Sequence, residues 1–140
     1  MTFTSHPTST VSNSGYTLVG GSDVAAIIAK SVDSGDDTSY VESIADSKDF
    51  QVTLEAPGFS PEVGDGHVLR FRGQSDSSGS SSAEVEVSLL DLGLGGSNVI
   101  TSVTTTLSSV MTTYEFDLDF SAPLTDYSAL AIQVTDIGRS

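Results

Sequence analysis

The chain has 140 residues, of which 37% are hydrophobic, and contains neither cysteine nor tryptophan. This length suits one domain with one core, and the lack of cysteine excludes disulfides and thiolate metal sites. Asp and Glu total 19 against 5 Lys and Arg, a formal net charge of −14. Because such a surface repels phosphates and anionic lipids, we expect neither nucleic-acid nor membrane binding.

The N-terminal segment is rich in Ser and Thr and poor in apolar residues. It predicts an extended arm over residues 1–14, followed by a single domain over residues 15–140. An arm of this kind either hangs free or lies on a neighbouring subunit. No stretch of the chain is long and apolar enough to span a bilayer, and the start lacks the pattern of a signal peptide, so we expect synthesis in a cytoplasm.

The next elements are short. A first strand is expected at 16–19, and Gly20 and Gly21 are expected to end it. The run 24–29 predicts a helix of about two turns, capped by Ser22 or Asp23. After a loop, residues 38–44 are expected to be extended.

From Phe50 the apolar residues alternate with polar ones, which is typical of strands. Two later segments, around Phe71 and around Val87, alternate in the same way on either side of the Ser-rich loop 74–82. One register satisfies both faces of such a hairpin. It pairs Leu69 with Val87, Phe71 with Val85, Arg70 with Glu86 and Arg72 with Glu84.

The C-terminal part contains three further candidate strands. Residues 99–107 are rich in Thr, residues 114–120 alternate large apolar, mostly aromatic, with acidic side chains, and residues 130–134 alternate large apolar with small or polar ones. About seven strands separated by polar loops predict an all-β fold. We expect an antiparallel two-sheet β-sandwich, jelly-roll-like, with one short N-terminal helix.

Sequence motifs for catalysis are weak. The two histidines, His6 and His67, stand in no spacing typical of a metal site or a catalytic triad. Asp117 and Asp119 alternate on a strand, which indicates a solvated face more than a pair of glycosidase carboxylates. The sequence therefore predicts a protein that is not an enzyme, and a lyase or hydrolase on a jelly roll is the last-ranked alternative.

One acidic loop is a candidate calcium site. Asp33, Asp36 and Asp37 cluster beside Gly35, and carboxylate oxygens are the ligands that Ca²⁺ prefers. Their spacing does not match the twelve-residue calcium loop, and clusters arise by chance in so acidic a chain. We therefore predict no cofactor, with calcium at this loop as the alternative.

Two segments resemble small β-sandwich structural proteins of tailed bacteriophages. Residues 36–41 are similar to their "D-x-T-Y-V" segment, which follows a short alanine-containing helical piece. Residues 124–130, between two strands, resemble their "T-D-Y/W-S-D-L" ending. The chain departs from the pattern at Ala129, where an acid is usual, and in lacking the tryptophan often found near the start.

The resemblance implies a virion structural protein: a head decoration protein, a head fibre or a tail-associated module. A fibre would usually need a coiled-coil or collagen-like stalk, which is not seen. We therefore expect a capsid decoration (cement) protein on the outer head surface, with the major capsid protein and its own copies, as a trimer, for partners. The candidate contact residues in the arm are Thr2, Phe3, Thr4, His6, Pro7 and Val11.

The alternative is a tail-associated adsorption module that binds host-surface carbohydrate. It predicts exposed aromatic side chains that converge near a polar loop. The candidates are the four tyrosines, Tyr16, Tyr40, Tyr114 and Tyr127, of which Tyr114 alternates in phase with the core.

Overall fold

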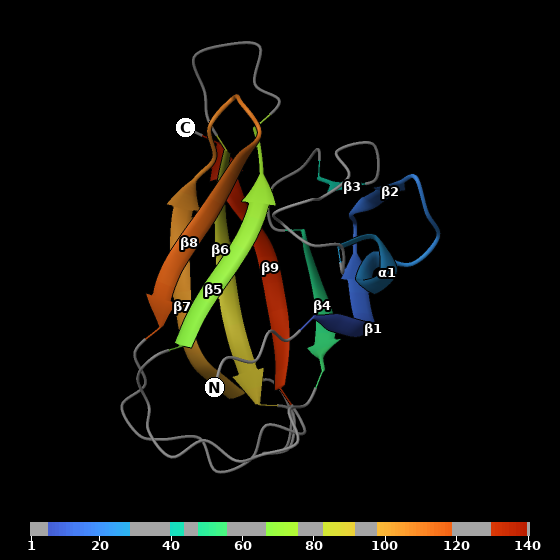
Figure 1. The fold of residues 1–140 in the computed structure, drawn as a ribbon. Coiled ribbons are helices and arrows are strands. Elements are labelled where there is room, and N and C mark those ends of the chain that lie inside the picture. Colours follow the sequence, from blue (N-terminus) through green and yellow to red (C-terminus); the bar gives the residue numbers. More distant parts are fainter. Residues whose placement is uncertain are drawn as a thin grey trace.

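The computed structural model describes residues 6–28, 40–43, 48–55, 67–75, 83–91, 98–118 and 130–139. These residues form nine strands and one short helix (Figure 1), which confirms the all-β class. The elements are β1 (Pro7–Ser14), β2 (Thr17–Val19), α1 (Val24–Ile28), β3 (Tyr40–Glu42), β4 (Asp49–Leu54), β5 (His67–Gly73), β6 (Ala83–Asp91), β7 (Asn98–Thr106), β8 (Thr112–Leu118) and β9 (Leu130–Arg139).

The described strands form three antiparallel sheets. The largest has five strands in the order β1-β4-β9-β6-β7, and the two small ones pair β5 with β8 and β2 with β3. Figure 1 shows β5 and β8 in front of one half of the large sheet, with α1 beside β1 at the other end. Two layers of strands thus enclose the interior, as a β-sandwich requires.

The strand pairs are nested. Strand β4 pairs with β9, β5 with β8, and β6 with β7, so the chain runs through three strands and returns beside the same three in reverse order. Such a long hairpin, folded over so that its middle pair lies in the other layer, is the principle of a jelly roll. The jelly-roll-like arrangement is therefore built from the chain between residues 49 and 139.

One face of the large sheet supplies most of the core. Phe50 lies opposite Val134, which lies opposite Val87 on the next strand, so a single apolar row crosses three strands. Residues that face each other across an antiparallel pair point to the same side of the sheet. Helix α1 covers this face near β4, where its Val24 and Ala25 pack with Phe50.

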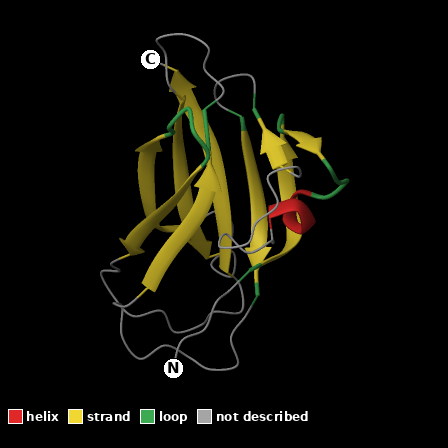
Figure 2. Ribbon diagram, turned by 45° about the horizontal axis from the view of Figure 1, so that its top comes forward, coloured by secondary structure: helices red, strands yellow, loops and turns green. Residues whose placement is uncertain are grey.

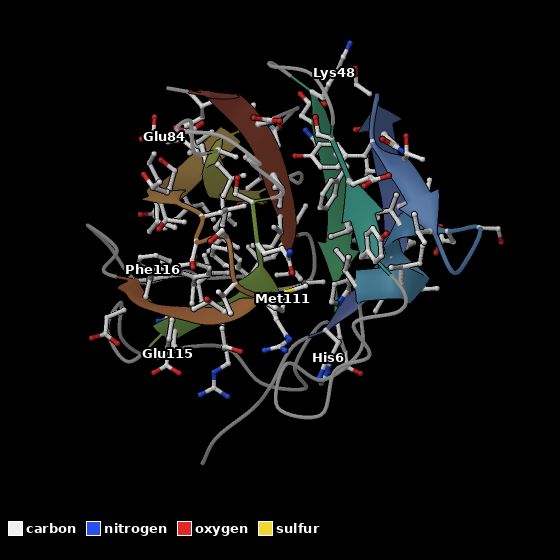
Figure 3. The ribbon with its side chains drawn as sticks, turned by 90° about the horizontal axis from the view of Figure 1, so that it is seen from above. His6, Lys48, Glu84, Met111, Glu115 and Phe116 are labelled. Carbon is white, nitrogen blue, oxygen red and sulfur yellow. The ribbon has the colours of Figure 1, made fainter. Side chains whose placement is uncertain are left out.

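Strands β5 and β8 supply the opposite layer. Phe71 stacks on Tyr114, with ring centroids 5.3 Å apart, and lies 6.0 Å from the ring of Phe116. Figure 3 shows Phe116 and Glu115 on opposite sides of β8, the ring toward the interior and the carboxylate away from it. The alternation of aromatic and acidic residues that predicted this strand is thus confirmed.

The predicted hairpin between β5 and β6 is wrong. Strand β5 pairs with β8, so that Leu69 lies opposite Phe116 and Arg70 opposite Glu115. Strand β6 instead lies between β7 and β9 in the large sheet. The alternation of β5 fits β6 and β8 equally well as partners. Pairing with β8 is favoured because it adds aromatic pairs on the inner face.

The described part of the predicted N-terminal arm is extended, but Pro7–Ser14 is not separate from the domain. It is strand β1, paired with β4 at one border of the large sheet. The pairing reaches back to His6, whose carbonyl accepts a 2.8 Å hydrogen bond from the amide of Glu55. Low hydrophobicity does not exclude such a strand, because an edge strand needs only backbone partners and one covered side.

Helix α1 is held by a cap that links it to β1. The Asp23 carboxylate accepts a 3.0 Å bond from the amide of Ala26, as an N-cap residue does. Thr10 of β1 donates its hydroxyl to the same carboxylate at 2.7 Å and accepts the amide of Ala25 at 3.0 Å. Asp23, one of the two predicted caps, is thus the cap, and Figure 2 shows the helix beside the strands that it joins.

Candidate interaction surface

Three of the six predicted contact residues lie in the described part of the chain. His6 precedes β1, while Pro7 and Val11 belong to it; Thr2, Phe3 and Thr4 lie outside the described residues. The pairing of β1 with β4 shifts register between Pro7 and Ser9 and again between Thr10 and Ser12. Val11 is therefore the extra residue of a β-bulge, and it is 47% exposed. A bulge re-aims the side chain that it carries, here an apolar one at the sheet border.

A hydroxyl cluster holds the first half of β1 in place. The hydroxyls of Thr8 and Ser9 lie 2.8 and 2.7 Å from the hydroxyl of Thr53 on β4. At the other end of β1, the Asn13 side chain bonds both the amide and the carbonyl of Tyr16 at 2.9 Å, which closes the turn around Gly15. Gly15 has φ +106°, a conformation in which only glycine is unstrained. The exposed Val11 is thus presented by a fixed element.

The predicted calcium loop with Asp33, Asp36 and Asp37 lies outside the described residues. Within the described ranges, no three His, Asp or Glu side chains are grouped so that they could hold a metal ion. His67 begins β5 opposite Leu118, on the same face of the strand as Leu69.

A buried polar corner lies where β4 and β9 meet. Tyr16 packs edge-on against Phe50, with ring centroids 4.9 Å apart. Burial raises the pKa of the Tyr16 phenol well above its usual value, and the nearby carboxylates of Asp136 and Asp49 raise it further. Asp136 is 3% exposed, and its amide donates a 2.8 Å bond to the carbonyl of Lys48. The corner keeps the phenol neutral, which suits a structural role.

The outer face of β5 and β8 carries charges in register. The Arg70 guanidinium donates to the Glu115 carboxylate from two nitrogens, at 2.9 and 2.7 Å. Arg72 donates to the hydroxyl of Thr113 at 3.4 Å. Both groups of the Arg70–Glu115 pair are about half exposed, so the interaction is worth little. The arginines were predicted as cross-strand partners of acids; for Arg70 that is confirmed, with Glu115 in place of Glu86.

Strand β7 forms the other border of the large sheet. In the described residues it pairs with β6 alone, and Figure 1 shows no labelled strand beyond it in that layer. Ser102, Thr104 and Thr106 are exposed on one face, while Thr101, Val103 and Thr105 are half-buried on the other. Between Thr101 and Thr106 the border therefore carries mainly hydroxyls and backbone groups, and no side chain of β7 is charged.

The described tyrosines do not gather into one exposed platform. Tyr16 packs in the core beside α1, and Tyr114 stacks on Phe71 between the layers. Tyr40, on β3, is 40% exposed, and Tyr127 lies outside the described residues. Stacking of sugar rings on aromatic side chains, expected for an adsorption module, thus has one exposed candidate in the part that the structure describes.

Comparison with protein-family models, with curated proteins and with solved structures finds no match to this chain. Of the two segments that carry the bacteriophage resemblance, Tyr40 and Val41 lie in β3 and Leu130 begins β9; the rest lies outside the described residues. Among the described elements, no helix has the length and apolar character needed to cross a membrane.

Two features of this surface were not predicted from the sequence. One is the bulge that exposes Val11, because register shifts depend on the partner strand. The other is the position of β7 at a border, which no local pattern reveals. The signal that could have suggested it is the absence of charge from residues 98–106 in so acidic a chain.

Proposed function

We propose that this chain is a non-enzymatic structural protein of a bacteriophage virion, a decoration protein that binds the outer surface of the head lattice and stabilises it. Its partners are the major capsid protein and further copies of itself. It is made in the host cytoplasm and attached to the particle. The residue-level resemblance of segments 36–41 and 124–130 suggests this class.

The observation that best supports the proposal is the position of the N-terminal contact segment. Pro7 and Val11 lie on a border strand that is fixed to the domain, and the bulge exposes an apolar side chain there. A decoration protein works through buried area, so it needs a rigid surface with an apolar contact at its centre. The surplus of acidic residues keeps unattached copies soluble.

The number of copies per particle tests the proposal. Quantitative mass spectrometry of purified virions, calibrated on the major capsid protein, is expected to find hundreds of copies, because the head lattice repeats its sites many times. A few to a few dozen copies would place the protein at the tail or at a vertex and favour the carbohydrate-binding alternative. Absence from the particle would contradict both.

A substitution at the bulge tests the contact surface. Val11→Asp is expected to weaken attachment to heads at least tenfold, since it puts a charge into an apolar contact. The control is Val110→Asp, which makes the same change at a valine that is 69% exposed in the connection between β7 and β8. Co-sedimentation with heads lacking the protein measures both. Equal attachment of the two variants would remove Val11 from the contact.

A further inference from the structure

The segment from Thr101 to Thr106 is a regular and uncharged strand border. It pairs residue by residue with β6 from Leu89 to Glu84, and the register shift of β7 lies before it. Its outer side has no partner among the described strands. The backbone amides and carbonyls of such a border can pair with a further strand.

The other borders of the described sheets each carry a feature that blocks pairing. Strand β1 contains Pro7 and two bulges, while β2 and β3 have three residues each. Strand β5 carries Arg70 and Arg72, and β8 carries Glu115 and Asp117. Proline, bulges, short length and charge are the usual protections of edge strands. Among the described borders, β7 between Thr101 and Thr106 has none of them.

We propose that β7 pairs with β7 of a second copy of this chain, in antiparallel orientation, and joins the two large sheets into one. The distribution of charge limits where two copies of the chain can meet. With 19 acidic and 5 basic residues, most surfaces of a second copy repel the first. Each copy has the same uncharged β7 border. A two-fold axis between two copies places these two borders side by side.

The side chains fit this arrangement. A two-fold axis through Val103 places Thr101 opposite Thr105 of the second copy, and Ser102 opposite its Thr104. Each pair then lies on the same face of the sheet, hydroxyl beside hydroxyl, which stabilises cross-strand contacts. Self-pairing of one border is complete with two copies, so the inference predicts a dimer in place of the trimer expected from the sequence.

The salt dependence of binding distinguishes a second copy of this chain from a basic strand of another protein. Two copies of charge −14 repel each other, so screening by salt is expected to strengthen the dimer. Binding of a basic strand from another protein would be weakened by the same salt. The contact is confined to one strand and buries less than a standard interface, so we expect dissociation on dilution.

Sedimentation velocity of the full chain, over micromolar to millimolar concentrations and in 0.1 and 0.5 M NaCl, tests the proposal. We expect the dimer fraction to grow with concentration and with salt. Thr104→Lys is expected to lower the association constant at least tenfold, because lysine on an edge strand blocks pairing. The control, Thr17→Lys, places the same charge at another exposed threonine, on β2, and is expected to dimerise like the wild type.

Ser102→Lys is a second variant at the same border, for use if the first does not fold. Hydrogen exchange gives an independent measurement, because dimerisation is expected to slow exchange of amides within 101–106. A chain that stays monomeric, forms trimers, or dimerises equally well with lysine at position 104 or 102 would overturn the inference. A high copy number on virions together with such a result would leave the proposed function standing and remove only the β7 contact.

Discussion

At the scale of single residues, the buried phenol of Tyr16 makes the free energy of unfolding depend on pH. Its phenol is held neutral by burial and by Asp136 and Asp49, so its pKa lies above the value near 10 of the unfolded chain. Below pH 10 the phenol is protonated in both states. Above pH 10 only the unfolded chain loses the proton, so stability falls with rising pH by about 1.4 kcal/mol per pH unit.

Tyr16→Phe is expected to remove this contribution and to flatten the loss of stability between pH 10 and 11. Phenylalanine keeps the edge-on contact with Phe50. Urea unfolding at pH 9, 10 and 11 measures the free energy of unfolding of both proteins. Tyr40→Phe, which removes an exposed phenol, isolates the effect of burial. Parallel curves for Tyr16→Phe and the wild type would contradict the assignment.

The role of a residue was predictable where its interaction partners lie close to it in the sequence. Asp23 was a predicted helix cap because an acid before an apolar run satisfies the first amides of a helix. Tyr16 was expected in a strand, yet it lies just before β2 and packs in the core. Its two carboxylate neighbours come from positions 49 and 136, so the sequence around Tyr16 could not predict them.

At the scale of elements, the pairing of β5 is open to a direct test. A double-mutant cycle on Arg70 and Glu115 is expected to give a coupling free energy of about 0.2–1 kcal/mol, the range for exposed pairs. The matching cycle on Arg70 and Glu86, the pair expected from the sequence, is expected to give about zero, since Glu86 lies on a strand of the other sheet. Unfolding in urea at low salt measures both cycles. A larger coupling to Glu86 would restore the β5–β6 hairpin.

The positions of most strands were predictable, while their partners were not. Alternation located β4, β5, β6 and β8 within a few residues, because half-buried strands must alternate. The Thr-rich composition located β7, and β9 continues to Arg139, beyond the predicted end at Val134. Partner choice depends on contacts between residues far apart, such as Phe71 with Tyr114, and alternation alone scores β6 and β8 alike as partners of β5. Strand β1 was missed as part of the sheet for a related reason, since its support comes from Thr53 on β4 and Asp23 before α1.

At the scale of the whole molecule, the sandwich class followed from strand number and polar loops, and the nesting of β4 to β9 explains its jelly-roll character. The candidate interaction surface was predictable only in part. Composition suggested the N-terminal segment, and Val11 is exposed there; its role as a contact residue stays a prediction. The bulge and the β7 border are properties of the assembled sheet, because they exist only once β4 and β6 have taken their places.

The net charge of −14 makes the stability of the whole chain dependent on salt. Repulsion among 19 acidic groups destabilises the compact state, and screening relieves it. Raising NaCl from 0.02 to 0.5 M is therefore expected to increase the melting temperature, where each gain of about 1 kcal/mol corresponds to roughly 3–5 °C. The Arg70–Glu115 pair opposes this trend, but an exposed pair contributes at most about 1 kcal/mol.

The double substitution Glu84→Gln and Glu86→Gln removes two of the acidic groups from β6 while keeping side-chain size. It is expected to raise the melting temperature at 0.02 M NaCl and to reduce the gain on adding salt, since fewer charges remain to be screened. Thermal unfolding by circular dichroism, at a concentration low enough to keep the chain monomeric, separates this effect from dimer formation. A melting temperature that falls with salt in the wild type would show that attractive pairs outweigh the repulsion.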